Sequence, residues 1–280
     1  MRRNFRLKWH GLPFFTCFLC FIWLQPALAV KPTDTVFVSI LPQKMFIRQI
    51  SGDRLNIEVM VQPGASPATY EPKPSQMRKL ALSKAYFAVG VPFENAWLDR
   101  ISGVNPAMQI IHTDQGIEKV AMVSHNHDTH ADEDDHEHDH QSGLDPHIWL
   151  SPLLVKKQAA NITAGLIELF PENKAFFQSN YHNFEQRLED LHTKLKKQLL
   201  PYQGKQFMVF HPSWGYFARE YSLKQVAIEI EGKSPKPAQL SKFIEQARRD
   251  GIRIIFAQKQ FSTKNAQVIA QAIGGEVVLV

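Results

Sequence analysis

Residues 171–200 read PENKAFFQSNYHNFEQRLEDLHTKLKKQLL, and they stand between two similar halves of the chain. The large apolar side chains of this stretch recur every three or four residues, as they do along one face of a helix: Tyr181, Phe184, Leu188, Leu191, Leu195 and Leu199. We therefore predict one helix over about 172–200, with a proline and an acid in its first turn and a length of roughly 39 Å. The same stripe suits a stiff connector between two lobes and an ordinary long core helix.

On both sides of this helix, short β-rich runs alternate with helical patterns. Strands are predicted at 35–40, 56–61, 85–90 and 109–112, and again at 206–210, 224–230, 252–257 and 276–280. Helical patterns cover 43–50, 75–83, 237–250 and 263–273. Strands that alternate with helices predict parallel sheets with helices on their faces. The expected fold is α/β, with two lobes, each a four-stranded parallel sheet flanked by helices, joined by one long helix.

The expected boundaries follow from this alternation. The first lobe should span 30–152, the linker region that holds the long helix 153–204, and the second lobe 205–280.

Residues 1–29 form a separate segment, because a basic start at Arg2, Arg3, Arg6 and Lys8 precedes an apolar run over 12–24 and the small-x-small site Ala27-Leu28-Ala29. This pattern predicts a signal peptide that is cleaved after export to the periplasm. The apolar run is shorter than the roughly 20 residues of a membrane anchor.

Removal of the leader changes the charge and the cysteine content. The net charge falls from +5 to +1, because four basic residues leave and 28 basic and 27 acidic residues remain. A nearly neutral protein gives no reason to expect a nucleic-acid partner. Cys17 and Cys20 leave as well, so we expect neither a disulfide nor a thiolate ligand. With 44% hydrophobic and 21% charged residues, the composition excludes a disordered chain and a multi-span membrane protein.

A low-complexity segment over 124–142 mixes histidines with acidic residues. It has no apolar period, and its histidines are His125, His127, His130, His136, His138 and His140. Such a segment cannot bury a core, and we expect a mobile loop. Imidazole and carboxylate are the ligands of first-row transition metals that remain once thiolate is absent, so the segment indicates metal association. The alternative is a solvated acidic tract that happens to contain histidine.

Two isolated histidines stand in more restrained surroundings. His147 lies in the segment DPHIWLSP over 145–152, where prolines restrict the backbone. His211 follows the predicted strand 206–210 and precedes Pro212-Ser213-Trp214-Gly215. Ligands bind just beyond the carboxyl ends of the strands in open parallel sheets, which is where His211 is expected. For each histidine taken alone, a structural hydrogen bond in a turn is the favoured alternative.

Three other histidines carry less information. His182 and His192 fall on the polar faces of the predicted long helix, where we expect solvent exposure. His112 ends a predicted strand and is compatible with either role.

Three ordered segments resemble a known family. They are PGASPATYEP at 63–72, DPHIWL at 145–150 and HPSWGYF at 211–217. From about Asp34 to Val280 the chain resembles the periplasmic metal-binding solute-binding proteins of ATP-binding-cassette importers, in the zinc and manganese cluster A-I. The acidic histidine segment is typical of the zinc-type members. The resemblance implies two lobes bridged by one long helix, with a metal ion held between the lobes by about four side chains.

The resemblance assigns ligand roles to individual residues. His147 matches the family's second ligand and His211 the third, a position where manganese-type members usually have glutamate. Imidazole suits zinc, so the resemblance implies zinc, with manganese as the alternative. The first ligand position holds Ala68, which cannot coordinate. Glu71, a loop histidine or water could substitute.

The fourth ligand of the family is an aspartate just after the last strand. This chain stops at Val280, at the end of that predicted strand, so we expect a truncated sequence.

The expected function is capture of zinc in the periplasm and its delivery to a membrane permease of an ABC importer, by a monomer that is not an enzyme. One alternative is a manganese or other divalent-metal protein of the same family. Another is a periplasmic metal buffer that uses only the histidine-rich loop. A zinc hydrolase is disfavoured, because the chain contains no His-Glu-x-x-His element and no evident general base beside either isolated histidine.

Overall fold

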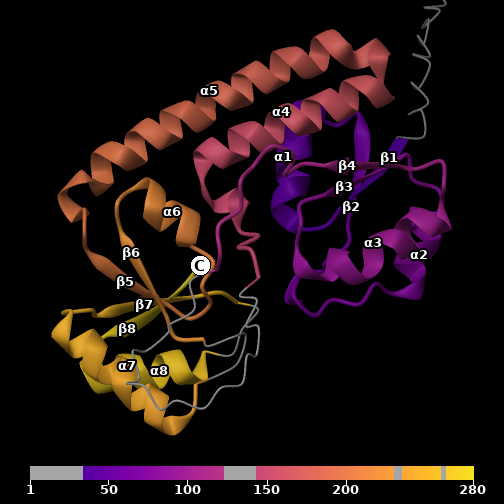
Figure 1. The fold of residues 1–280 in the computed structure, drawn as a ribbon. Coiled ribbons are helices and arrows are strands. Elements are labelled where there is room, and N and C mark those ends of the chain that lie inside the picture. Colours follow the sequence, from indigo (N-terminus) through magenta and orange to yellow (C-terminus); the bar gives the residue numbers. More distant parts are fainter. Residues whose placement is uncertain (1–33, 123–142, 230–234, 260–262) are drawn as a thin grey trace, which may run out of the picture. The chain divides into compact units, whose positions relative to one another are not determined.

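The structure is a computed structural model that describes residues 34–122, 143–229, 235–259 and 263–280. Its first sheet consists of β1 (Asp34–Val38), β2 (Leu55–Val59), β3 (Ala85–Ala88) and β4 (Gln109–His112). The strands are parallel and lie in the order β2-β1-β3-β4 (Figure 1). Every β3 residue is buried, in keeping with the continuous apolar runs of central parallel strands.

The second sheet repeats this topology. It consists of β5 (Gln206–Val209), β6 (Lys224–Ala227), β7 (Ile254–Ala257) and β8 (Glu276–Leu279), parallel and in the order β6-β5-β7-β8. The eight predicted strands and the predicted α/β fold with two four-stranded parallel sheets are confirmed. The strands are one to three residues shorter at several ends than the sequence pattern indicated.

The helices of the first lobe are α1 (Leu41–Ser51), α2 (Pro74–Leu80), α3 (Pro92–Val104) and α4 (Pro152–Leu169), with a 3-10 turn, η1 (Ile148–Leu150), just before α4. Those of the second lobe are α6 (Gly215–Glu220), α7 (Pro237–Arg249) and α8 (Lys264–Ile273). Phe243 of α7 and Ile269 of α8 pack in one buried cluster with Ile255 of β7, so both helices cover the same face of the second sheet (Figure 1).

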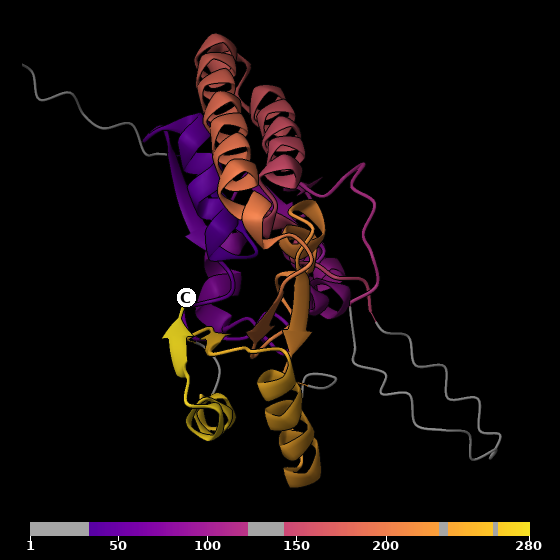
Figure 2. The same cartoon turned by 90° about the vertical axis from the view of Figure 1, so that its left-hand side faces the viewer.

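The long helix is α5 (Lys174–Leu199), with a 3-10 turn at each end, η2 (Pro171–Asn173) and η3 (Leu200–Tyr202). It lies against α1 and α4, and α4 runs beside it in both views (Figures 1 and 2). The linker region 153–204 therefore contains two helices. In addition, α4 packs closely on the first sheet, because a Cβ atom at Gly165 would lie 2.7 Å from Cδ1 of Ile111.

The apolar stripe of α5 is buried along only part of its length. Phe177, Phe184 and Leu188 lie in the core of the first lobe together with Phe46 and Ile50 of α1. Leu191, one turn later, is 44% exposed. The helix is thus a core helix of the first lobe over its first half and a connector over its second half. In the described ranges, no helix combines the length and apolarity needed to cross a membrane.

Candidate metal centre

His147 is held in place by the residue two positions before it. Oδ1 of Asp145 accepts a hydrogen bond from the backbone N–H of His147 at 2.9 Å and lies 2.7 Å from its ring Nδ1. Pro146 fixes the backbone between the two residues, and η1 begins directly after the histidine. The His147 side chain is only 11% exposed, and its ring packs against Trp149 at 5.0 Å between centroids. The ring orientation is therefore set from both sides.

His211 lies two residues beyond the carboxyl end of β5 in the second sheet. Its register follows from Val209, which pairs with Ala227 of β6 and with Phe256 of β7. Two residues further along, the same register places His211 beside Glu229. Ring Nδ1 of His211 lies 2.7 Å from Oε2 of Glu229. As on the other side of the site, a buried carboxylate orients the imidazole through Nδ1.

The two imidazoles meet through their remaining nitrogens. Nε2 of His147 lies 3.3 Å from Nε2 of His211, and the ring centroids are 5.1 Å apart. Two zinc–nitrogen bonds of about 2.05 Å that meet at the tetrahedral angle of about 109° place their nitrogens about 3.3 Å apart. The separation in this structure matches the span of two ligands on a shared zinc ion, and it also matches a hydrogen bond between the rings.

The expected positions of the protons on the two imidazole rings also favour a shared metal ion. When Nδ1 of each ring donates its proton to a carboxylate, each Nε2 presents a lone pair. Two lone pairs at this distance repel unless a cation or a proton lies between them. Burial lowers the pKa of His147 below its usual value, although Asp145 acts in the opposite direction. The ring is accordingly neutral at neutral pH and can coordinate a metal ion.

Comparison with known proteins agrees with the fold and with the type of site. A family model described as zinc-uptake complex component A, periplasmic, matches residues 36–280. The chain belongs to this family. Among curated relatives, the high-affinity zinc uptake system protein ZnuA of Bacillus subtilis is 26% identical over 281 residues, which cover 96% of this chain and 86% of that protein. ZnuA of Yersinia pestis is 27% identical and covers 84% and 79%, respectively.

Structural comparison gives the same family. A crystal structure of ZnuA superimposes with a TM-score of 0.79 at 38% identity, covering 88% of this chain and 90% of that one. A ZnuA deletion mutant with zinc bound superimposes with a TM-score of 0.78, also at 38% identity. The zinc-binding lipoprotein AdcA of Streptococcus pneumoniae is 24% identical, and the match covers 91% of this chain and about half of that protein, 52%.

Glu71, the one other candidate ligand named from the sequence that the described residues include, does not form a metal-binding group with the pair of imidazoles. Ala68 and Glu71 are both exposed. Within the described ranges, no group of three or more His, Cys, Asp and Glu side chains is arranged to hold a metal ion. Glu71 therefore does not form such a group with the two histidines in the part of the chain that the structure describes. The loop histidines over 124–142 and the leader over 1–29 lie outside the described residues.

The remaining histidines divide as follows. His182 is 71% exposed, as predicted. His112, at the end of β4, is about half exposed and lies 3.8 Å from Asp114. The prediction for His192 is wrong: its side chain is only 12% exposed, because Glu220 at the end of α6 and Tyr221 just after it lie against the ring, with the Tyr221 hydroxyl 3.3 Å from Nδ1.

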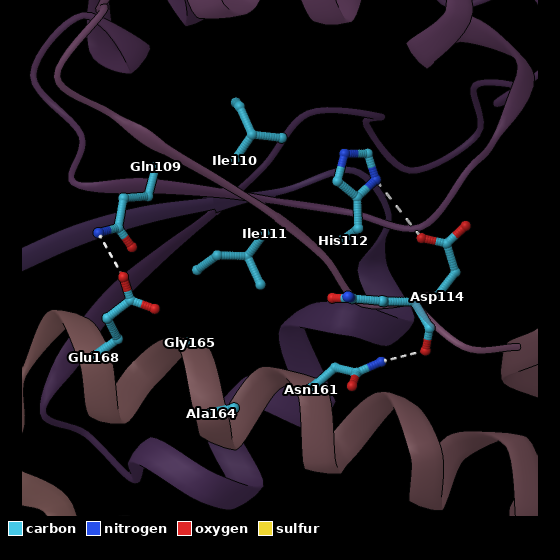
Figure 3. Close-up of a pocket in the computed structure, with 10 residues that line it drawn as sticks. Gln109, Ile110, Ile111, His112, Asp114, Asn161, Ala164, Gly165 and Glu168 are labelled. Atoms are coloured by element: carbon cyan, nitrogen blue, oxygen red, sulfur yellow. Dashed lines mark hydrogen bonds and ion pairs between the residues drawn. The ribbon is translucent and has the colours of Figure 1, made fainter.

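A cavity in the first lobe lies in a different part of the chain from the two histidines. It measures about 830 Å³ and lies between β4 and α4, with Ile110 and Ile111 along the strand and Asn161 and Glu168 on the helix (Figure 3). Neither His147 nor His211 lines it. The candidate metal centre is thus a contact between one buried and one partly buried side chain, apart from this cavity.

Three residues near the site were not identified as functional from the sequence. Asp145 and Tyr216 lie within motifs, but the sequence pattern indicates no role for them or for Glu229. Glu229 lies 18 positions from His211 and becomes its neighbour only through the pairing of β5 with β6. A search for acidic residues at register positions beside each isolated histidine would have found it.

Proposed function

We propose that this protein captures zinc between its two lobes and delivers the ion to the membrane permease of an ABC importer. His147 contributes one ligand from the first lobe and His211 one from the second. The observation that carries the proposal is the 3.3 Å separation of the two Nε2 atoms, each on a ring whose Nδ1 faces a carboxylate. A ligand pair split between lobes couples metal binding to the arrangement of the lobes, which is what a permease must recognise.

The chemistry of the pair favours zinc over manganese. Both identified groups are neutral nitrogen donors, whereas manganese prefers carboxylate, carbonyl and water oxygens. Asp145 and Glu229 are placed to hold the imidazoles through Nδ1. Carboxylate–histidine–zinc arrangements of this kind raise ligand basicity and fix the ring tautomer. Water or further protein groups would complete the four-coordinate shell that zinc prefers.

A zinc titration in competition with a chelator tests the two ligands. We expect His147→Ala and His211→Ala each to weaken zinc binding by more than the roughly 10–100-fold that follows loss of an outer-shell partner. His182→Ala is the matched control, because His182 is exposed on α5 and should leave the affinity unchanged. Wild-type affinity in both site variants would refute the assignment.

Export is a separate part of the proposal. We infer that residues 1–29 form a leader that is removed, which agrees with the periplasmic description of the family. Expression in a Gram-negative host, followed by N-terminal sequencing of the periplasmic fraction, should give Val30 as the first residue. Recovery of the protein only in the cytoplasm, with Met1 intact, would contradict the inference.

A further inference from the structure

Tyr216 reaches from the second lobe into the first. It lies on α6, five residues after His211, yet its ring packs in the buried cluster of the first lobe that contains Phe37, Tyr86 and Ile148. Only 6% of Tyr216 is exposed. Burial raises the pKa of its hydroxyl, so the group stays protonated and can donate a hydrogen bond.

The Tyr216 hydroxyl completes a backbone ladder. Val120 and Asp145 form a pair in which the N–H of Asp145 donates to the carbonyl of Val120 at 2.8 Å. The reciprocal bond of an antiparallel pair would run from the N–H of Val120 to the carbonyl of Asp145. The hydroxyl takes the place of that bond: it accepts from Val120 N at 3.2 Å and donates to Asp145 O at 2.8 Å.

Gly215 approaches the same aspartate from the same helix. A Cβ atom at Gly215 would lie 2.8 Å from Oδ2 of Asp145, closer than real Cβ contacts allow. The Asp145 side chain cannot yield freely, since it is buried and its Oδ1 contacts both the backbone and the ring of His147. The backbone of the second lobe therefore limits where this carboxylate can lie.

We propose that Gly215 and Tyr216 are positioning residues: together they clamp Asp145 across the lobe boundary and thereby hold His147 at the distance from His211 that zinc requires. The proposal rests on the proposed function and deepens it. One short segment, 211–216, then supplies a zinc ligand of the second lobe and also the support for the ligand of the first lobe. The clamp forms only when the lobes are in contact, so it links lobe closure to the geometry of the metal centre.

Two substitutions test the clamp without touching a ligand. Tyr216→Phe keeps the ring and removes the bridging hydroxyl, and Gly215→Ala adds one methyl group against Oδ2 of Asp145. We expect each to lower zinc affinity roughly tenfold, mainly through faster dissociation measured by chelator capture. Tyr221→Phe is the matched control for the first, because Tyr221 lies just after the same helix and its hydroxyl faces His192. Gly103→Ala is the control for the second, because a Cβ atom there meets nothing within 4 Å.

A second readout separates positioning from plain stability. Thermal unfolding is measured for each variant with and without zinc. A purely structural contact would lower both midpoints equally, whereas a positioning contact lowers the zinc-induced increase as the affinity falls. An unchanged zinc-induced increase and unchanged affinity in Tyr216→Phe and Gly215→Ala, with binding lost in His147→Ala, would overturn the clamp and leave the proposed function intact. Unchanged binding in His147→Ala as well would overturn both.

Discussion

Glu94 is a buried carboxylate at the carboxyl ends of β1 and β3, apart from the two histidines. It accepts hydrogen bonds from the Ser39 hydroxyl and from the backbone N–H groups of Val89 and Gly90, and the Tyr86 hydroxyl lies 2.7 Å from the Ser39 oxygen. Burial raises the pKa of Glu94 even though these hydrogen bonds act in the opposite direction. The network ties two central strands to α3.

The raised pKa of Glu94 makes the stability of the first lobe depend on pH. Between the unfolded value of about 4.5 and the higher folded value, the folded protein holds a proton that the unfolded chain has released. The free energy of unfolding should therefore fall as pH rises through this window. Urea unfolding of wild type and Glu94→Gln from pH 4 to pH 7 measures the effect. The wild type should be more stable by about 1–3 kcal/mol near pH 4, and this advantage should shrink as pH rises. Parallel profiles for the two proteins would contradict the prediction.

At the scale of single elements, α5 is a helix with two environments. Leu188 is 7% exposed and packs in the core of the first lobe, whereas Leu191 is 44% exposed. Leu188→Ala should lower the free energy of unfolding by about 2–4 kcal/mol, because it leaves a cavity in a packed core. Leu191→Ala should cost less than about 1 kcal/mol, since most of its side chain already contacts water. Chemical denaturation of both variants gives the comparison, and equal costs would show that the stripe is buried uniformly.

The sequence was most informative about elements and least informative about contacts between them. A buried parallel strand such as Ala85–Ala88 reads as an apolar run, which the sequence shows directly. The helix α4 was not among the predicted helices, and a glycine and β-branched residues weaken its helical pattern. His192 was predicted to be exposed because it lies on the polar face of α5. The contacts of His192 with Glu220 and Tyr221 are tertiary contacts, which the periodicity of one helix cannot predict.

The same distinction between local pattern and tertiary contact applies to the residues of the candidate site. His147 and His211 could be singled out from their positions after restrained turns and strand ends. Their supports could not, because Glu229 depends on the β5–β6 register and Tyr216 on the contact between lobes.

At the scale of the whole molecule, the residues on either side of the histidine-rich segment pair with each other in the first lobe. Ala121 and Leu144 form an antiparallel bridge, and the N–H of Met122 donates to the carbonyl of Gly143 at 3.1 Å. The two chain ends that flank 123–142 are therefore adjacent. A two-residue Asn-Gly turn in place of 123–142 should connect Met122 to Gly143 without disturbing their pairing, since this dipeptide favours the tight turn between antiparallel strands.

This replacement distinguishes a two-lobe zinc site from a loop that merely collects metal. We expect the shortened protein to bind fewer zinc ions in total and to keep its tightest site, as measured by titration against a chelator. Loss of tight binding together with the segment, while circular dichroism shows an intact fold, would contradict the two-lobe site and favour a metal buffer that uses only the histidine-rich loop.

The uneven burial of α5 also sets an order of events during synthesis. Phe177, Phe184 and Leu188 belong to the same core as strand residues Val36 and Val38, some 140–150 positions earlier in the chain. The core of α7, α8 and their sheet draws its buried members from 208–270 alone. The core that α5 shares with β1 therefore cannot be completed until about 190 residues have left the ribosome, whereas the core of α7, α8 and their sheet needs no earlier segment. The first sheet is synthesised before α5, and until α5 has emerged the apolar surface of this sheet is the part of the nascent chain that a chaperone would have to shield.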